Sequence, residues 1–309
     1  MKKDKKQLQN KRKYADAALQ KIEDARLEFY GKYKFHNNLK LVVTVICFMA
    51  ILLVIFLKEV IANGTFQGLP LIIAILALAV AYGYSVYVKR KFNNKMKTYF
   101  ELYFKSINDY ALSSKGFKDV ELQKPGKITL DEFKECQLYK DVCEAGSRGL
   151  TTFKYNKVEM SVVDCAGNIK DAKRMRPVFV GKMVRAKASY KGEKPVIIYL
   201  KGNDRALPPT NLEGIKKQEE DKKMIVYSNN EDYKKVLTAK ARKTLEEIKT
   251  EKVLVDVAVS IYKGKAFAML GYDDPLMVLP LQNEFDDAPT IKYKKDIEVV
   301  AKLLEALNK

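Results

Sequence analysis

The chain has 309 residues, of which 57 are Lys or Arg, 38 are Asp or Glu and one is His, so its formal net charge is +19. A single histidine excludes histidine-rich metal sites, and four cysteines without a Cys-x-x-Cys pair argue against a zinc ribbon or a disulfide scaffold. With 47% apolar residues the chain is not a disordered tail, and its length suffices for a folded core.

Two apolar stretches near the N-terminus predict a transmembrane helical hairpin. Residues 41–57 carry no charged side chain, and residues 69–88 form a second such stretch. At 1.5 Å per residue these helices reach about 26 Å and about 30 Å, close to the thickness of the hydrocarbon layer. Tyr82, Tyr84 and Tyr87 suit an interfacial belt at the end of the second stretch. The alternative, two buried helices of a soluble protein, is disfavoured because core helices are shorter and less uniformly apolar.

The charges beside these stretches orient the predicted hairpin. Residues 1–40 carry twelve basic and five acidic residues, whereas Lys58 and Glu59 cancel in the connection 58–68. A basic group without acidic residues follows the second stretch and consists of Lys89, Arg90, Lys91, Lys95 and Lys97. By the positive-inside rule both termini are cytosolic, which predicts a two-span protein of the cytoplasmic membrane.

Apolar positions recur at helical spacing on both cytosolic sides of the predicted hairpin 41–88. In residues 1–40 these positions include Ala18, Ile22, Ala25 and Phe29. In residues 89–112 they include Phe92, Met96, Tyr99 and Tyr103. Both patterns are typical of amphipathic helices, so we expect the two helical extensions to pack on each other. The alternative is that each extension lies flat on anionic lipid.

The remaining residues, 113–309, predict a cytosolic α+β domain with a mixed, mainly antiparallel sheet and packed helices. A linker rich in Gly, Ser and Pro opens it, and a polar loop is expected at 212–223. Strands are expected at 158–164, 178–188, 196–200, 224–227, 253–262 and 266–270. Helices are expected at 231–237, after a cap at Thr238, and at 296–307. The turn Lys263-Gly264 marks the clearest hairpin, and the lack of regular β–α alternation favours α+β.

Several of these segments occur in an order shared with one bacterial membrane family. They are the two early apolar stretches, Val178-Phe179-Val180-Gly181, Met224-Ile225-Val226-Tyr227-Ser228, Lys235-Val236-Leu237-Thr238, the hairpin 253–270 and a terminal helix. In this order, over most of the chain after residue 40, the sequence resembles the family catalogued as domain of unknown function thirty-one thirty-seven. One departure is Lys182-Met183 after Gly181, where the family has Leu after Gly. The resemblance implies a membrane-anchored cytosolic domain and brings no catalytic residues.

No motif in the sequence identifies a catalytic, metal or cofactor site. His36 lies at the predicted membrane edge and is expected to have a structural or interfacial role. Cys136 and Cys143 lie seven residues apart, which suits one helix face, but no histidine accompanies them to complete a metal site. Residues 145–149 lack the spacing of a phosphate-binding loop and are expected to form a plain turn. We therefore predict no cofactor, and the balance is against an enzyme.

The densest basic tract outside the predicted spans lies in residues 170–187. It consists of Lys170, Lys173, Arg174, Arg176, Lys182, Arg185 and Lys187. Nucleic acid is disfavoured as a partner because Phe179 is the one aromatic residue in the tract. Anionic lipid headgroups are the preferred partner of this tract and of the basic group that follows the second apolar stretch. Solvated charge without a partner is the default alternative.

Two classes of function remain open from the sequence. The preferred class is a membrane-anchored interaction or scaffold domain that binds another membrane or cytosolic protein, and small residues four apart in 69–88 leave a homo-oligomer open. The rival is a membrane-bound enzyme that acts on a lipid or phosphorylated substrate. A cavity that gathers carboxylates or a thiol beside basic residues would favour the enzyme. An exposed apolar patch or an unpaired strand edge would favour the interaction domain. The residues considered for such a cavity are Asp164, Asp204, Asp273 and Cys165.

Overall fold

The computed structural model describes residues 14, 16–61, 69–123, 126–139, 141–171, 174–201, 213–229, 231, 233–248, 254–272 and 284–308, without the side chains of 56–71 and 255. The chain divides into two units. The helical unit comprises Met1–Tyr103 and Leu279–Phe285, and the sheet unit comprises Phe104–Val278 and Asp286–Lys309. The division therefore falls inside a helix, nine residues before the boundary predicted at residue 113.

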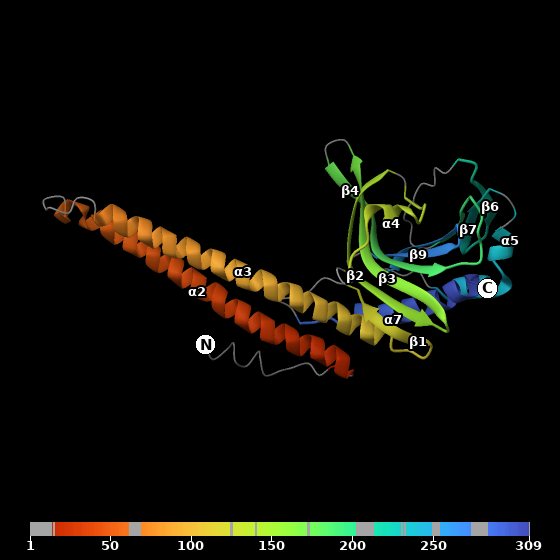
Figure 1. Cartoon of the computed structure of the whole chain (residues 1–309), viewed down its shortest axis with the longest axis horizontal. Coiled ribbons are helices and arrows are strands. Elements are labelled where there is room, and N and C mark those ends of the chain that lie inside the picture. The colour runs from red at the N-terminus through yellow and green to blue at the C-terminus, as the bar shows by residue number, and fades with distance from the viewer. Residues whose placement is uncertain are drawn as a thin grey trace. The chain divides into compact units, whose positions relative to one another are not determined.

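Two long antiparallel helices, α2 (Ala17–Ile61) and α3 (Leu69–Ala111), dominate the helical unit (Figure 1). Each runs without a break from an apolar stretch into the predicted extension, so the hairpin of helices with helical extensions is confirmed. Both helices are long and apolar enough to cross a membrane, and only 6% of the apolar window of each is buried. No described part of the chain covers these windows, which disfavours the alternative of soluble core helices.

Aromatic side chains hold the two extensions together. The ring of Phe29 on α2 stacks on Tyr99 of α3 at 5.2 Å between centroids and meets Phe92 edge-on at 5.9 Å. The buried cluster consists of Phe29, Val88, Phe92 and Tyr99, with Ala25, Tyr33, Tyr84 and Met96 packed against it. Each large side chain buried in this way contributes roughly 1.5–3 kcal/mol. The predicted packing of the two extensions on each other is confirmed.

A buried ion pair organises the beginning of α2. Arg26 donates to both carboxylate oxygens of Glu23, at 2.7 and 2.6 Å. The backbone N–H of Phe285 also donates to Glu23, at 3.1 Å, and the hydroxyl of Tyr14 donates to the carbonyl of Phe285. These contacts explain why a segment close to the C-terminus belongs to the helical unit, a feature that helical periodicity alone does not indicate.

The sheet unit is built on an antiparallel sheet. Its strands are β1 (Phe117–Leu122), β2 (Val142–Tyr155), β3 (Val158–Asp171), β4 (Arg174–Lys187), β5 (Val196–Leu200), β6 (Lys216–Glu220), β7 (Met224–Ser228), β8 (Leu254–Tyr262) and β9 (Lys265–Tyr272). The nine strands lie in the order β1-β2-β3-β4-β9-β8-β5-β7-β6, and each described pairing is antiparallel. The helices are α4 (Leu130–Lys134), α5 (Tyr233–Val236), α6 (Ala239–Glu247) and α7 (Ala288–Leu307). The predicted α+β class is confirmed.

Several local expectations are wrong. Strand β1 lies in the predicted linker, β6 lies in the predicted polar loop, and residues 145–149 lie inside β2 rather than in a turn. Cys136 follows α4 while Cys143 lies in β2, so the two do not share a helix face. Helix α7 begins at Ala288, eight residues before the predicted start. In the strands, pairing with a neighbour supplies the stability that local composition lacks.

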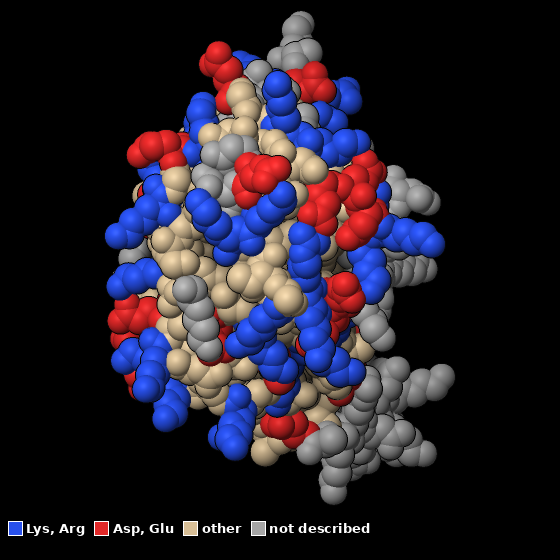
Figure 2. All heavy atoms as spheres, turned by 90° about the vertical axis from the view of Figure 1, so that its right-hand side faces the viewer, with Lys and Arg blue, Asp and Glu red and all other residues tan. Residues whose placement is uncertain are grey.

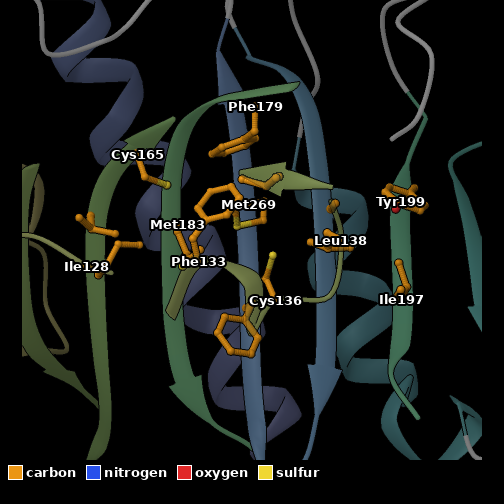
Figure 3. Packing of buried hydrophobic residues seen from close by; sticks show 14 residues of the cluster. Ile128, Phe133, Cys136, Leu138, Cys165, Phe179, Met183, Ile197, Tyr199 and Met269 are labelled. Atoms are coloured by element: carbon orange, nitrogen blue, oxygen red, sulfur yellow. The ribbon is translucent and has the colours of Figure 1, made fainter. Parts of the chain in front are cut away.

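Helices α4 and α7 cover opposite faces of the sheet. Adjacent residues of a strand point to opposite faces of the sheet. On β4, Met183 lies in the core on the α4 side. The ammonium of its neighbour Lys182 lies on the other side, 4.1 Å from the ring centre of Tyr293 on α7. Figure 3 shows the α4-side core, with Phe133 among side chains of β3, β4 and β9. Gly167 leaves room for the ring of Phe133, because a Cβ at position 167 would lie 2.6 Å from that ring.

Two predicted turn and cap features are confirmed. Lys263 and Gly264 both have positive φ, 47° and 78°, and join β8 to β9 as a two-residue hairpin turn. The side chain of Thr238 accepts a hydrogen bond from the N–H of Ala241 at 3.2 Å and caps α6.

Candidate functional site

A cavity of about 300 Å³ lies on the α7-side face of the sheet unit. Its lining comes from β2, β3, β4 and the end of β9 and includes Gly146, Arg148, Asp164, Ala166, Lys182 and Tyr272. Gly146 and Ala166 are paired in register on neighbouring strands. Because neither carries a large side chain, the sheet is hollow at this point.

Three charged residues form a row across the strands beside this hollow. Arg148 of β2 pairs in register with Asp164 of β3, which pairs with Lys182 of β4. The ammonium of Lys182 donates a hydrogen bond to the carboxylate of Asp164, and Nε of Arg148 lies 3.9 Å from the same carboxylate. Lys182 is 2% exposed, whereas the side chain of Arg148 is 42% exposed. Two cations and one carboxylate give the row a net charge of +1.

Aromatic hydroxyl groups and α7 complete the surroundings of this row. The hydroxyl of Tyr272 donates to Asp296 of α7 at 2.9 Å, and the hydroxyl of Tyr293 donates to the side-chain oxygen of Asn108 at 3.2 Å. Burial raises the pKa of both tyrosines well above the ordinary value, so both stay neutral. Burial lowers the pKa of Lys182, and the carboxylate of Asp164 opposes this shift by favouring the charged ammonium.

The cavity suits binding better than covalent chemistry. Cys165 borders it, but this side chain lies in the α4-side core (Figure 3), and burial raises the pKa of its thiol well above the ordinary value. A buried neutral thiol is a poor nucleophile. Asp204 and Asp273, the other residues considered for such a site, lie outside the described residues. Within the described part of the chain, no group of three His, Cys, Asp or Glu residues is placed to hold a metal ion.

The basic tract 170–187 does not form one surface. Lys182 is buried and paired, so its assignment as a headgroup contact is wrong: strand alternation turns it into the sheet unit beneath α7. Arg185 is half-buried and donates to Glu132 at 3.2 Å, and exposed Lys187 pairs with Glu159 at 3.1 Å. Lys173 lies outside the described residues. The exposed cations near the hairpin between β3 and β4 are Lys170, Arg174 and Arg176.

The basic group that follows the second apolar stretch lies on the surface of α3. Lys89, Arg90, Lys95 and Lys97 are exposed, and half-buried Lys91 donates to the hydroxyl of Tyr87 at 3.0 Å. This arrangement leaves the charges open to solvent or headgroups.

The environment of His36 fits the structural role expected for it. Its Nδ1 lies 3.5 Å from the hydroxyl of Tyr84, and its ring centre lies 5.3 Å from that of Phe92. The histidine therefore extends the aromatic packing between α2 and α3.

A larger groove of about 540 Å³ elsewhere on the sheet unit is lined by charges that neutralise one another. The ion pairs there are Lys154–Asp119 at 2.9 Å, Lys187–Glu159 at 3.1 Å and Lys265–Glu135 at 2.8 Å. Figure 2 likewise shows basic and acidic side chains interspersed over one face of the molecule. Among the described residues of that face, acidic side chains interrupt the basic ones, unlike the continuous basic field that follows a nucleic-acid backbone.

The described surface of the sheet unit lacks the features expected of an apolar docking site. Among its described residues, the large apolar side chains that are exposed are Met175 and Ile291. The edge strand β6 reads Lys-Lys-Gln-Glu-Glu, and charged side chains on an edge discourage pairing with another strand. The cavity is therefore the more distinctive feature of this unit.

Comparison with known proteins identifies no family. No protein-family model matches the chain, and no curated protein matches it, so membership of the family catalogued as domain of unknown function thirty-one thirty-seven stays a prediction. One solved structure, the crystal structure of the mycobacterial trehalose monomycolate transport factor A, TtfA, is similar with a TM-score of 0.36 and 12% sequence identity. The match covers 66% of this chain and 96% of that chain. A likeness at this level carries no argument about fold or function.

Proposed function

We propose that α2 and α3 anchor this protein in the cytoplasmic membrane, with both termini in the cytosol, and that its sheet unit is an interaction domain for another membrane or cytosolic protein. The observation that carries the anchoring is the exposure of large apolar side chains along both helices. Leu41 is 64% exposed, Ile46 is 62% exposed and Leu76 is 59% exposed. Water disfavours such a surface, whereas lipid tails solvate it.

The distribution of charge supports the cytosolic orientation. The exposed cations Lys89, Arg90, Lys95 and Lys97 begin one residue after the second apolar stretch ends. Basic residues in this position favour the cytosolic side, where anionic headgroups attract them. Contacts of these cations, and of Lys170, Arg174 and Arg176, with anionic lipid are part of the proposal.

Reporter fusions test the anchoring. Reporters placed before Met1 and after Lys309 should both read cytosolic, while an epitope inserted at 63–67 should be reachable from outside in cells stripped of their wall. A matched control carries the same epitope in the hairpin turn Lys263-Gly264 of the sheet unit, where it should be protected. An epitope at 63–67 that is protected in intact cells would overturn the orientation.

Affinity capture of the detergent-solubilised full chain tests the interaction domain. A protein that co-purifies in a fixed ratio would support a protein partner under one condition. It should be lost in Phe133→Ala, which disrupts the sheet unit, and kept in Phe48→Ala. A chain that purifies alone over a range of mild detergents would contradict it.

A second candidate function is that of a membrane-bound enzyme acting on a lipid or phosphorylated substrate. The observation that favours it is the cavity, which places the carboxylate of Asp164 beside the cations of Arg148 and Lys182. Against it stands the lack of an activated nucleophile among the described lining residues, because the thiol that borders the cavity is buried and neutral.

A further inference from the structure

We infer that the hairpin between β3 and β4 inserts the side chain of Met175 into the headgroup layer of an anionic membrane. The hairpin tip consists of the described residues 168–171 and 174–177. The inference rests on the proposed anchoring, because the sheet unit is then tethered to the bilayer. A tethered unit needs only a weak second contact, since binding at that contact is intramolecular.

The hairpin tip extends beyond the strand beside it. β3 and β4 pair in register as far as Asp171 and Arg174. On its other side, β4 pairs with β9 from Gly181 to Lys187. The residues of β4 before Gly181 therefore have no described strand on that side (Figure 1). The end of the hairpin is an arm that can touch a flat surface with its tip.

Met175 gives the tip an apolar side chain that water disfavours. It is 48% exposed, and Ile291 is the other exposed large apolar side chain among the described residues of the sheet unit. Arg174, Arg176 and Pro177 beside it are exposed as well. A thioether is flexible and fills irregular space readily. An apolar side chain held among cations suits the boundary between headgroups and acyl chains.

Cations on both faces of the tip suit anionic headgroups. Lys170 lies opposite Met175 in the register and shares its face, whereas Arg174 and Arg176 lie on the other face. Arg176 pairs with Asp171 at 3.8 Å, but both side chains are more than half exposed, so water weakens this pair. Among the described residues, no carboxylate forms an ion pair with Lys170 or Arg174. Long basic side chains reach headgroups while an apolar neighbour lies deeper.

The acidic residues of the neighbouring strand do not reverse this charge. By sequence, residues 168–177 carry four basic residues and one acidic residue. Residues 140–144, at the start of β2, carry one basic and two acidic residues. The two segments together are positive, so the anionic surface of a membrane attracts the tip.

The edge of the tip disfavours an added protein strand as the occupant. Pro177 has no backbone N–H to donate, and the pairing of β3 with β4 shifts register between Gly167 and Asn168, next to this proline. Proline and irregular pairing protect a strand edge against further strands. A bilayer surface requires no hydrogen bonds from a strand edge, so anionic lipid is the occupant that these observations favour.

A single introduced tryptophan tests the insertion, because the chain contains no tryptophan of its own. The full chain carrying Met175→Trp is reconstituted in nanodiscs. With phosphatidylglycerol present, its emission should shift to shorter wavelength and brominated lipid tails should quench it, and raised salt should reverse both changes. With phosphatidylcholine alone, both effects should be much smaller. Ile291→Trp is the matched control, because it places the same fluorophore at another exposed apolar position, and it should show neither effect.

Charge variants of the Met175→Trp chain test the role of the cations. Lys170→Gln combined with Arg174→Gln should remove most of the quenching in phosphatidylglycerol. Lys187→Gln, which removes an exposed cation of the same strand that pairs with Glu159, should leave the quenching unchanged. Equal quenching in the two charge variants would overturn the role of the cations at the tip.

Phe48→Trp separates this inference from the proposed anchoring. This position lies in the apolar part of α2 and should be quenched with or without phosphatidylglycerol and at any salt concentration. An unquenched Phe48→Trp would overturn the anchoring and, with it, the inference. A quenched Phe48→Trp, together with a Met175→Trp that responds no more than Ile291→Trp, would overturn the hairpin contact alone.

Hydrogen exchange measures the same contact with the native side chain in place. The backbone amides of the hairpin tip should exchange more slowly in nanodiscs with phosphatidylglycerol than in nanodiscs without it. Met175→Ser should lose at least half of this slowing, and Met175→Leu should keep it because leucine is apolar and of similar size. Full slowing in Met175→Ser would show that charge alone holds the tip and would overturn the insertion.

Discussion

The helical unit and the sheet unit use the same apolar residue types in opposite ways. Phe48 on α2 is 59% exposed, whereas Phe133 on α4 is fully buried against strands of the sheet unit. A single solvent does not favour both arrangements, because water penalises an exposed apolar side chain wherever it lies. The proposed anchoring accounts for the difference, because it places the apolar windows of α2 and α3 in lipid and the sheet unit in water.

The two units also differ in how they use a buried ion pair. Glu23 and Arg26 are three residues apart on one helix and satisfy each other with two short hydrogen bonds. Lys182 and Asp164 are neighbours across two strands, share Arg148, and border a cavity of about 300 Å³. The carboxylate of Glu23 accepts hydrogen bonds from Arg26 and from the backbone N–H of Phe285. The pair of Lys182 and Asp164, in contrast, has space beside it for a ligand.

The largest effect is expected from removing a core aromatic ring. Phe133→Ala should lower the free energy of unfolding of the sheet unit by about 3–5 kcal/mol, because it loses buried area and leaves a void over Gly167. Phe48→Ala should change it by less than about 0.5 kcal/mol, since this ring is exposed. Urea unfolding of the full chain in detergent, followed by near-ultraviolet circular dichroism of its tyrosines, measures both. Equal losses for the two variants would break the comparison.

Breaking the buried cross-strand pair should have the next largest effect. Asp164→Ala leaves the ammonium of Lys182 buried without its carboxylate and should cost about 3 kcal/mol. The double variant Asp164→Leu with Lys182→Met should recover most of the loss, because no charge then remains unpaired. Glu159→Ala, which breaks the exposed pair with Lys187, is the control and should cost less than about 1 kcal/mol. An additive double variant would show that the pair is not coupled.

The sequence predicts the helical unit almost completely because its order is local. An uninterrupted apolar stretch and a stripe at helical spacing are each determined by residues a few positions apart, and α2 and α3 follow both patterns. What the pattern misses is the docking of Phe285 on Glu23, a contact between residues 262 positions apart. No local periodicity reports such a contact.

The sequence predicts the sheet unit less well because the order of this unit is not local. β2 carries the segment Gly146-Ser147-Arg148-Gly149, which favours a turn by composition, and becomes a strand through its register with β3. The row of Arg148, Asp164 and Lys182 depends on that register, so spacing along the chain could not place it. The sequence places Lys182 among the possible contacts with anionic lipid because a run of basic residues does not reveal which members alternate into the core.

A smaller effect is expected from the aromatic packing between α2 and α3. The stacked rings of Phe29 and Tyr99 should show a coupling of about 0.5–1.5 kcal/mol in a double-mutant cycle with leucine at both positions. Phe29→Leu combined with Tyr82→Leu is the control cycle and should be additive, because Tyr82 is 74% exposed. Thermal unfolding in detergent supplies the energies. Disulfide formation between cysteines at Ala25 and Tyr99 provides a second measurement, and its absence would contradict the packing.

The smallest effect concerns the edge of the sheet, where Glu220 of β6 accepts hydrogen bonds from Lys201 and from Lys217, each at 2.6 Å. These two ammonium groups lower the pKa of Glu220 from an ordinary value of 4.5 to about 2. A carboxylate with a depressed pKa in the folded state stabilises that state above its unfolded pKa, and the stabilisation is lost as the pH falls from about 4.5 towards about 2. Glu220→Gln should therefore remove a small part of the acid sensitivity of unfolding in this window. Glu213→Gln, which changes an exposed glutamate without an ion pair among the described residues, is the control and should leave this acid sensitivity unchanged.

Because the ion pairs of Glu220 lie at the surface, 1 M salt should raise the titration midpoint of the Glu220 carboxyl, measured by NMR, towards the ordinary value. A midpoint near 4.5 at low salt would show that β6 is not held by these two lysines.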